Sequence, residues 1–265
     1  MFQLYYRKHC AAAVYLENSN DTDWLLVLDA DTGVVNPAHC LEDYIDSTKD
    51  LIFYERFFSY EVMSGNYFVR NTAFGRRFLH RWADYEFTAP NSWNGYDNGA
   101  LQILLLETLL PDNEPELRMC REFWKEATTL ETYLPYVMCC KVALGGRRVW
   151  DRVKIFRRAH GWAIDGALTN GKFCRWHFMF HGWKHDTVGK DSWGSPLKRL
   201  IRKEECQPYK RWPTTRNARI SCNQAKEIYR WHDRDDAKRV PQVARQLPFL
   251  TKTHLLWHCW PHCHH

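Results

Sequence analysis

Two aspartates one residue apart, Asp29 and Asp31, directly follow an apolar run from Trp24 to Leu28. The run predicts a short buried strand, and carboxylates just beyond its end are held close together at a sheet edge where ligands bind in α/β proteins. Two such carboxylates repel each other unless a cation lies between them, and Mg²⁺ and Mn²⁺ prefer these oxygen ligands. A strand followed by a plain acidic turn is the alternative, because a DxD motif is short and frequent by chance.

Three further segments accompany the DxD motif along the chain. They are MSGNYFVRNT (63–72), NGYDNGALQILL (94–105) and FMFHGWK (178–184). In this order and spacing, the four segments resemble glycosyltransferases of the GT-A fold. The resemblance is to an uncharacterised, nucleotide-diphospho-sugar transferase-like family expanded in nematodes. More distantly, the segments resemble fungal Golgi galactosyl- and mannosyltransferases and plant xylosyltransferases. The resemblance covers about residues 5 to 196.

The resemblance implies a metal centre for a nucleotide sugar. Asp29 and Asp31 would hold a divalent cation, Mn²⁺ or Mg²⁺, that bridges the two phosphates of a nucleotide diphosphate sugar, and His181 would be the third protein ligand. An imidazole beside two carboxylates suits Mn²⁺ better than a set of oxygens alone does. Lys184 would contact the β-phosphate as a point charge, and Gly182 would let the backbone approach the phosphate. The alternative for His181 by itself is a hydrogen-bonded core histidine.

The two middle segments would surround the sugars. By resemblance, Ser64 and Gly65 lie near the donor sugar, although Ser64 and Asn66 replace the Ala and Ser of the related families and so obscure the choice of donor. Asp97 corresponds to an acidic residue that faces the donor sugar and the acceptor. Its alternative role is the N-cap of a helix over 98–109.

The expected reaction transfers a sugar from the nucleotide donor to a hydroxyl of a glycan or glycoprotein acceptor, with retention of anomeric configuration. Asp97 and Lys184 would take part in catalysis. One alternative is a truncated transferase-like protein without activity. Another is a phosphohydrolase of the haloacid-dehalogenase type, whose motif also begins with strand-DxD. However, Gly33 stands where that motif has Thr or Val, and the pair Asp235-Asp236 lies in a polar region without a predicted strand.

The elements that position these residues alternate between strands and helices. Helical spacing predicts helices, and short apolar runs predict strands. Helices are expected over 2–16, 38–45, 73–85, 99–109 and 114–144, the last interrupted at Pro135, and strands over 24–28, 51–55, 153–156 and 178–181, with a bend into a strand over 61–71. This alternation predicts an α/β, GT-A-like (Rossmann-like) fold with a mixed, mostly parallel sheet flanked by helices. Because a helix comes first, the fold is expected to lack its first strand.

Composition indicates a soluble globular protein, with 45% hydrophobic and 26% charged residues. Residues 1–182 carry 20 basic and 23 acidic side chains, whereas residues 183–265 carry 17 and 8. We therefore expect a transferase domain over 1–196 and an irregular basic tail over 197–265, most simply a solvated extension, with no nucleic-acid partner. No apolar run is long enough for a membrane span, and no secretory signal is visible. Ten cysteines favour disulfides in the Golgi or another secretory lumen.

Overall fold

The computed structural model describes residues 4–36, 39–57, 59–112, 114–145, 147–183 and 219–230. They fall into two compact units. Unit 1 contains the described residues within 1–28 and 45–161. Unit 2 contains the described residues within 29–44 and 162–234.

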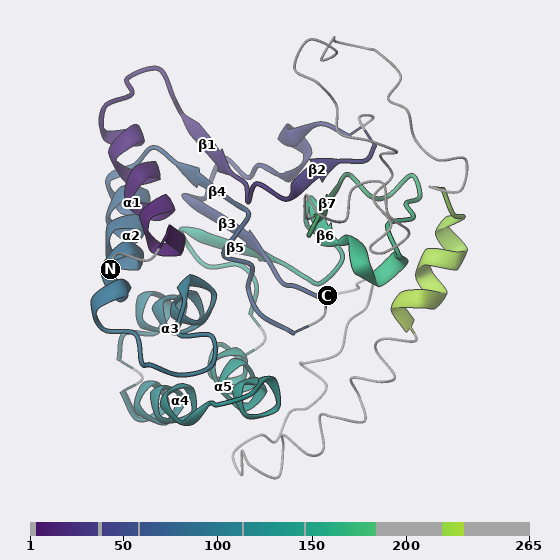
Figure 1. The fold of residues 1–265 in the computed structure, drawn as a ribbon. Helices are drawn as coiled ribbons and strands as arrows, with labels where there is room; N and C mark the ends of the chain where they lie inside the picture. The colour runs from purple at the N-terminus through teal and green to yellow at the C-terminus, as the bar shows by residue number, and fades with distance from the viewer. Residues whose placement is uncertain are drawn as a thin grey trace. The chain divides into compact units, whose positions relative to one another are not determined.

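Unit 1 is built on a four-stranded sheet flanked by helices (Figure 1). Its strands are β1 (Trp24–Val27), β3 (Leu51–Tyr54), β4 (Tyr67–Arg70) and β5 (Val153–Phe156), in the order β1-β4-β3-β5. Strand β4 runs antiparallel to both β1 and β3, and β5 runs parallel to β3. Strand β3 is fully buried, whereas all four residues of β1 are partly exposed. The prediction that 24–28 is a buried strand is therefore wrong in its burial, since β1 lies at an edge of the described sheet.

Five α-helices complete the described part of unit 1. They are α1 (Leu4–Glu17), α2 (Ala73–Asp84), α3 (Asp97–Leu109), α4 (Glu114–Glu126) and α5 (Leu130–Ala143), with a short 3-10 helix η2 (Tyr85–Phe87) after α2. Helix α1 packs beside α2, and α3 contacts α2, α4 and α5 (Figure 1). Nine of the 13 residues of α3 are buried, as expected of a helix that is apolar on all sides. Helix α2 begins where predicted, because the Thr72 hydroxyl accepts a hydrogen bond from the backbone N–H of Gly75.

The helical region after residue 114 is divided differently from the prediction. The break lies between α4 and α5, at residues 127–129, where Thr129 and Thr132 form a reciprocal cap for α5. Pro135 lies inside α5 rather than at an interruption. A disulfide between Cys120 and Cys139 joins the two helices. Capping and cross-linking thus decide the boundary that proline alone was expected to set.

Unit 2 contains a smaller, three-stranded sheet. Its strands are β2 (Thr32–Val34), β6 (Ala163–Asp165) and β7 (Met179–His181), in the order β2-β7-β6, and two 3-10 helices accompany them, η1 (Leu41–Tyr44) and η3 (Gly166–Thr169). Strand β7 pairs antiparallel with β2 and parallel with β6. Both sheets are therefore mixed, and the expectation of a mostly parallel sheet is wrong. The α/β class with helices flanking mixed sheets is confirmed.

The expected irregular tail contains an ordered part. Residues 222–230 form a helix, Cys222 is disulfide-bonded to Cys174, and Ala225 and Tyr229 are fully buried. Their spacing of four residues places both on one face of the helix, which explains why this basic stretch packs. Residues 184–218 and 231–265, where the rest of the tail prediction falls, lie outside the described residues.

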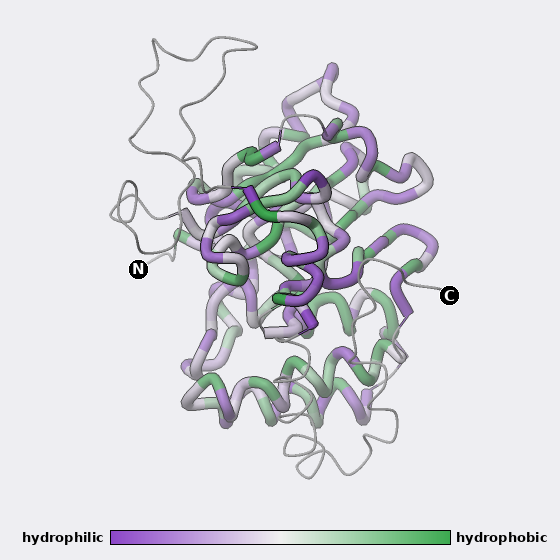
Figure 2. Tube along the Cα trace, turned by 90° about the vertical axis from the view of Figure 1, so that its right-hand side faces the viewer, coloured by the Kyte–Doolittle hydropathy of each residue, from purple (hydrophilic) through white to green (hydrophobic). Residues whose placement is uncertain are grey.

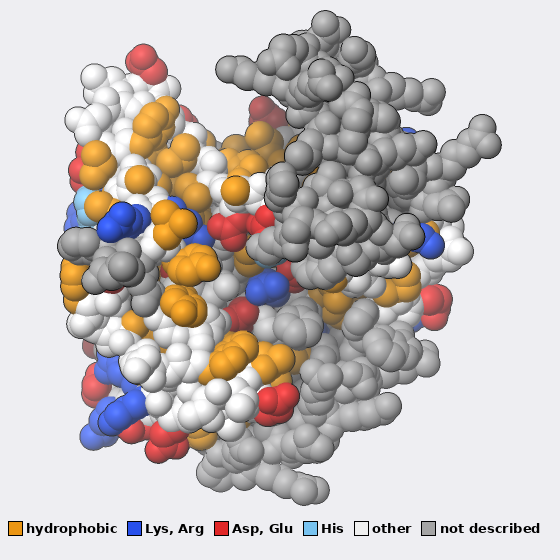
Figure 3. All heavy atoms as spheres, viewed as in Figure 1, with side chains coloured by type: hydrophobic (Ala, Val, Ile, Leu, Met, Phe, Trp, Pro, Cys, Tyr) orange, Lys and Arg blue, Asp and Glu red, His pale blue; other side chains and the backbone are white. Residues whose placement is uncertain are grey.

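The surface of the described elements is mixed. Figure 2 shows polar and apolar residues alternating along the helices. Figure 3 shows acidic and basic side chains in small groups, with hydrophobic side chains between them. Helix α1 exposes four large apolar residues, namely Leu4, Tyr5, Val14 and Tyr15. None of the described helices combines the length and the hydropathy that a membrane span requires.

Candidate metal centre

The DxD segment forms a tight turn in unit 2. The backbone N–H of Thr32 donates to the Asp29 carbonyl across 3.0 Å, and β2 begins at Thr32. Because β2 pairs antiparallel with β7, Thr32 lies opposite His181 in the register. Strand pairing, rather than closeness in sequence, therefore brings the histidine to the two aspartates.

A backbone clamp fixes the same contact. The N–H groups of Gly182 and Trp183 both donate to the carbonyl oxygen of Asp31, each at 2.9 Å. Gly182 has a φ of +100°, which residues with a side chain rarely adopt. At Gly33, a Cβ atom would lie 2.6 Å from the Trp183 ring, so a glycine there lets the indole pack against β2. Gly33 and Gly182 thus allow β2 and the segment that follows β7 to approach each other.

Three possible metal ligands converge at this point. Nε2 of His181 lies 3.5 Å from Oδ2 of Asp29 and 3.3 Å from Oδ1 of Asp31. One ligand atom from each of the three residues lies within 4.8 Å of the others. Adjacent ligands of an octahedral ion that bind at ~2.1 Å are ~3 Å apart, so this spacing suits a shared ion. The sequence-based prediction that Asp29, Asp31 and His181 converge is confirmed.

A fourth residue, Asp165, supports the histidine. It ends β6 and lies opposite His181 in the β6–β7 register, and its Oδ1 is 2.9 Å from Nδ1 of His181. No sequence motif singles out Asp165, although the segment Trp162–Asp165 has the same form as the DxD strand, an apolar run that ends in an aspartate. Metal-binding histidines commonly donate their other ring N–H to such a carboxylate.

The donor set fits a divalent cation. Two carboxylates and one imidazole nitrogen offer three ligands, and the Asp29 side chain is 32% exposed, so this ligand is accessible to solvent. An ion held there would keep coordination positions for a bound substrate, as catalytic metal sites do. Mixed oxygen and nitrogen ligands favour Mn²⁺ over Mg²⁺ or Ca²⁺.

The two middle segments meet in unit 1. The backbone N–H of Ser64 donates to Oδ1 of Asn98 at 3.1 Å, and the Gln102 side chain bonds to both the N–H and the C=O of Val62. Ser64 and Gly65 are both buried. These contacts join the two segments, whereas the role of Ser64 and Gly65 toward a sugar stays a prediction.

Asp97 lies in a buried network of unit 1. Its Oδ2 is 2.8 Å from Nζ of Lys8 and 3.2 Å from Nε2 of His9, whose other ring nitrogen is 2.9 Å from the Tyr67 hydroxyl. Burial alone would raise the pKa of Asp97, but the His9 hydrogen bond and the Lys8 charge lower it on balance. The predicted N-cap role is wrong: Tyr96 is the N-cap, and Asp97 is the first residue of α3. Its catalytic role stays a prediction.

Of the remaining predicted residues, Lys184 lies outside the described residues. Gly182 is described, and its N–H is used by the Asp31 carbonyl. The structure thus gives Gly182 a reason that sequence reasoning did not, namely its backbone conformation. Its approach to a phosphate stays a prediction.

The comparisons with known proteins give a family. A family model described as "Protein of unknown function, DUF273" matches residues 2–194, which is most of the chain and includes the whole DxD–His181 cluster. The chain belongs to this family. Neither the curated proteins nor the solved structures contain a match.

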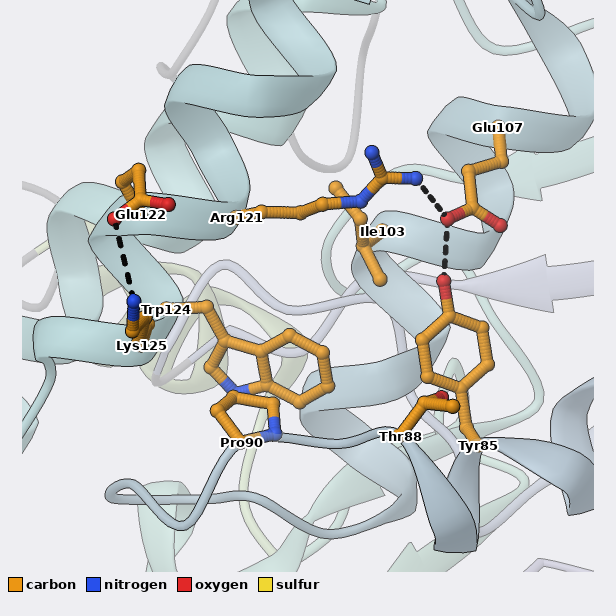
Figure 4. Close-up of a pocket in the computed structure, with 9 residues that line it drawn as sticks. All are labelled: Tyr85, Thr88, Pro90, Ile103, Glu107, Arg121, Glu122, Trp124 and Lys125. Atoms are coloured by element: carbon orange, nitrogen blue, oxygen red, sulfur yellow. Dashed lines mark hydrogen bonds and ion pairs between the residues drawn. The ribbon is translucent and has the colours of Figure 1, made fainter.

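Unit 1 of this DUF273 protein also contains a pocket of about 330 Å³ (Figure 4). Tyr85 and Trp124 form apolar walls, and Arg121 extends across to Glu107. The Glu107 carboxylate accepts from the Tyr85 hydroxyl at 2.5 Å and from Arg121 at 2.7 Å, and it pairs with Arg81 at 3.1 Å. The charge of Glu107 is thereby compensated, and the pocket contains none of the residues that the sequence singled out.

Proposed function

We propose that this protein is a metal-dependent transferase that moves a sugar from a nucleotide diphosphate sugar to a hydroxyl of a glycan or glycoprotein acceptor. The convergence of Asp29, Asp31 and His181 carries the proposal, because residues about 150 positions apart bring three potential ligands to one point. The resemblance of four separated segments to GT-A glycosyltransferases adds the substrate class. The mixed sheets flanked by helices are compatible with such a fold.

The proposed chemistry is mainly electrostatic. When bound, Mn²⁺ supplies positive charge that stabilises the departing diphosphate. Asp29 and Asp31 would hold that charge from their turn, and by the resemblance Lys184, which lies outside the described residues, would add a second positive charge at the β-phosphate. Such a site needs no strong base, which agrees with the proposed retention of configuration.

The disulfides bear on where this reaction would occur. Cys120–Cys139 and Cys174–Cys222 are formed within the described residues. Disulfides persist in oxidising compartments and are rare in the cytosol. We therefore place the proposed activity in the Golgi or another secretory lumen.

The phosphohydrolase alternative is less well supported. In that class the first aspartate is a nucleophile, and a later strand ends in a pair of aspartates that helps to bind the metal. Among the described residues, Asp29, Asp31 and His181 are the only group of at least three potential ligands of this kind. The imidazole between the carboxylates therefore favours a cation-holding role for both aspartates.

A binding assay tests the proposal. The unfolding temperature of the full chain is measured with nucleotide diphosphate sugars, with and without Mn²⁺, because only a ligand of the folded state raises it. We expect a donor-dependent increase that requires Mn²⁺, and sugar transfer from the same donor. Asp29→Asn and Asp31→Asn should each weaken Mn²⁺ binding at least about tenfold. Asp43→Asn, which alters an exposed aspartate of η1 in the same unit, is the matched control and should change nothing.

A wild-type chain that shows no Mn²⁺-dependent response to any nucleotide sugar would overturn the proposal. Binding of Mn²⁺ without any change in the unfolding temperature on addition of a nucleotide sugar would support the metal site but contradict the transferase activity. Release of phosphate from phosphomonoesters, lost in Asp29→Asn, would favour the phosphohydrolase instead.

A further inference from the structure

We infer that Asp165 is a positioning residue that fixes the tautomer of His181 and gives the metal centre its preference for Mn²⁺ over Mg²⁺. This inference rests on the proposed metal site, but it concerns a residue to which neither the sequence motifs nor the family match assigns a role. All the contacts that support it lie within unit 2.

The hydrogen bond between His181 and Asp165 determines which ring nitrogen of His181 carries the proton. An ionised carboxylate only accepts hydrogen bonds, so the 2.9 Å contact from Nδ1 of His181 to Asp165 requires a proton on Nδ1. In the neutral imidazole the lone pair is then on Nε2. This is the nitrogen that lies 3.3 Å from Asp31 and 3.5 Å from Asp29. Asp165 therefore selects the tautomer that can bind a metal ion at the DxD motif.

The Asp165 side chain does not cap its helix, which is the usual role of an aspartate at this position. It is the N-cap residue of η3, where an aspartate ordinarily accepts a hydrogen bond from the first turn of its own helix. Its side chain makes no such bond and instead contacts His181. With a side chain only 9% exposed, the carboxylate is largely removed from water and held by the β6–β7 register. The carboxylate is therefore directed to His181 rather than to the first turn of its own helix.

The negative charge of Asp165 also affects how strongly His181 binds a metal ion. A negative group behind Nδ1 increases the electron-donating power of Nε2, and loss of such a supporting carboxylate typically weakens metal binding about 10–100-fold. The nitrogen ligand matters more to Mn²⁺ than to the harder Mg²⁺, which prefers oxygen ligands and retains water. Loss of Asp165 should therefore reduce the affinity for Mn²⁺ more than the affinity for Mg²⁺.

Two substitutions separate the tautomer from the charge. Asp165→Asn keeps the shape and an oxygen that can accept from Nδ1–H, but it removes the charge. Asp165→Ala removes both. Asp43→Asn again serves as the matched control, and thermal unfolding confirms that each variant is folded. Because Asn is nearly isosteric with Asp, that variant carries the test if Asp165→Ala does not fold.

Two measurements are made on the full chain. Titration with Mn²⁺, followed by electron paramagnetic resonance with Mg²⁺ as competitor, gives both affinities. Nitrogen-15 NMR of labelled histidines in the metal-free protein, assigned with His181→Asn, reports whether Nδ1 carries a proton. The second measurement does not depend on any metal.

We expect Nδ1 of His181 to carry the proton in the wild type and in Asp165→Asn, and to share it with Nε2 in the neutral ring of Asp165→Ala. The Mn²⁺ affinity should fall about tenfold in Asp165→Asn and up to about 100-fold in Asp165→Ala, with a smaller change for Mg²⁺. An unchanged ratio of the two affinities in both variants would overturn the metal preference, as would a wild type that binds neither ion. An unprotonated Nδ1 in the wild type would overturn the positioning role. A wild type that binds Mn²⁺ but no nucleotide sugar would contradict the proposed transferase and leave this inference standing.

Discussion

At the scale of single residues, two buried aspartates illustrate how partners decide a role. Asp97 is enclosed by Lys8 and His9, so its carboxylate neutralises charge inside unit 1. Asp165 is enclosed with His181, whose other nitrogen faces two more carboxylates. Both are aspartates at the start of a helix, and only their tertiary neighbours separate a structural ion pair from support for a candidate metal ligand.

Gly182 gives a prediction at this scale. Its φ of +100° costs a residue with a side chain roughly 1–3 kcal/mol. Gly182→Ala should therefore lower the free energy of unfolding by about that amount. It should also weaken Mn²⁺ binding, because a strained backbone at residue 182 would displace the N–H that anchors the Asp31 carbonyl. Chemical denaturation and Mn²⁺ titration measure the two effects.

Gly145→Ala is the control for this substitution. Gly145 has a φ of +68° just after α5 in unit 1, and a Cβ atom there would meet no other atom within 4 Å, so the substitution has a backbone cost without a steric clash. It should lower stability without altering Mn²⁺ affinity. A Gly182→Ala protein that binds Mn²⁺ as the wild type does would show that the clamp is not needed for the site.

At the scale of elements, a disulfide, a polar contact and two buried side chains link the 222–230 helix to the rest of the described part of unit 2. The disulfide Cys174–Cys222 joins it to the segment before β7. The Cys174 N–H donates to Nδ1 of His177 at 2.9 Å, so Nε2 carries the proton and donates to the Tyr229 hydroxyl at 2.7 Å. Burial, followed by the Asp165 charge, raises the pKa of Tyr229, so this hydroxyl stays protonated.

Removal of the Cys174–Cys222 disulfide should destabilise this part of unit 2. The disulfide closes a loop of 48 residues, for which the loss of chain entropy in the unfolded state corresponds to about 4 kcal/mol. The double variant Cys174→Ala, Cys222→Ala should make residues 219–230 susceptible to limited proteolysis and destabilise unit 2 by up to that amount. Cys40→Ala, at an exposed free cysteine of the same unit, should have no effect. Equal protease resistance in the double variant and the wild type would contradict the prediction.

At the scale of the whole molecule, the two units should respond differently to acid. In unit 2, burial lowers the pKa of His177 to about 4. The unfolded chain, with an ordinary histidine pKa near 6.5, then binds more protons than the folded chain between about pH 6.5 and 4. Stability from His177 is therefore lost as the pH falls through this range, to an extent on the order of 3 kcal/mol.

Unit 1 should lose stability only at lower pH. Burial alone would raise the pKa of Glu55, but Lys141 and Arg148 lower it on balance, and the pKa of Asp97 is lowered in the same way. Carboxylates with lowered pKa values contribute stability above their unfolded values, near pH 4, and lose it below. Burial lowers the pKa of Lys141 to about 7, so its contribution changes only above neutral pH.

Hydrogen exchange as a function of pH tests this difference. We expect protection in residues 162–183 to decline between pH 6.5 and 4, while protection in α3 persists until the pH falls below about 4. His177→Gln should flatten the decline in unit 2 and leave α3 unchanged. Simultaneous loss of protection in both regions would show that the units do not respond separately.

Local features of this protein follow from its sequence. The apolar strand before Asp29 and the Thr72 cap are patterns within a few residues, set by spacing and side-chain type. Patterns of this kind were sufficient to predict the α/β class, whereas the cluster of Asp29, Asp31 and His181 was predicted from the resemblance of four separated segments to a known family. The β7 register, which brings Asp165 to His181, and the packing of the 222–230 helix emerged from the tertiary structure alone. Strand pairing and disulfides depend on contacts between distant residues, and no short stretch of sequence encodes them.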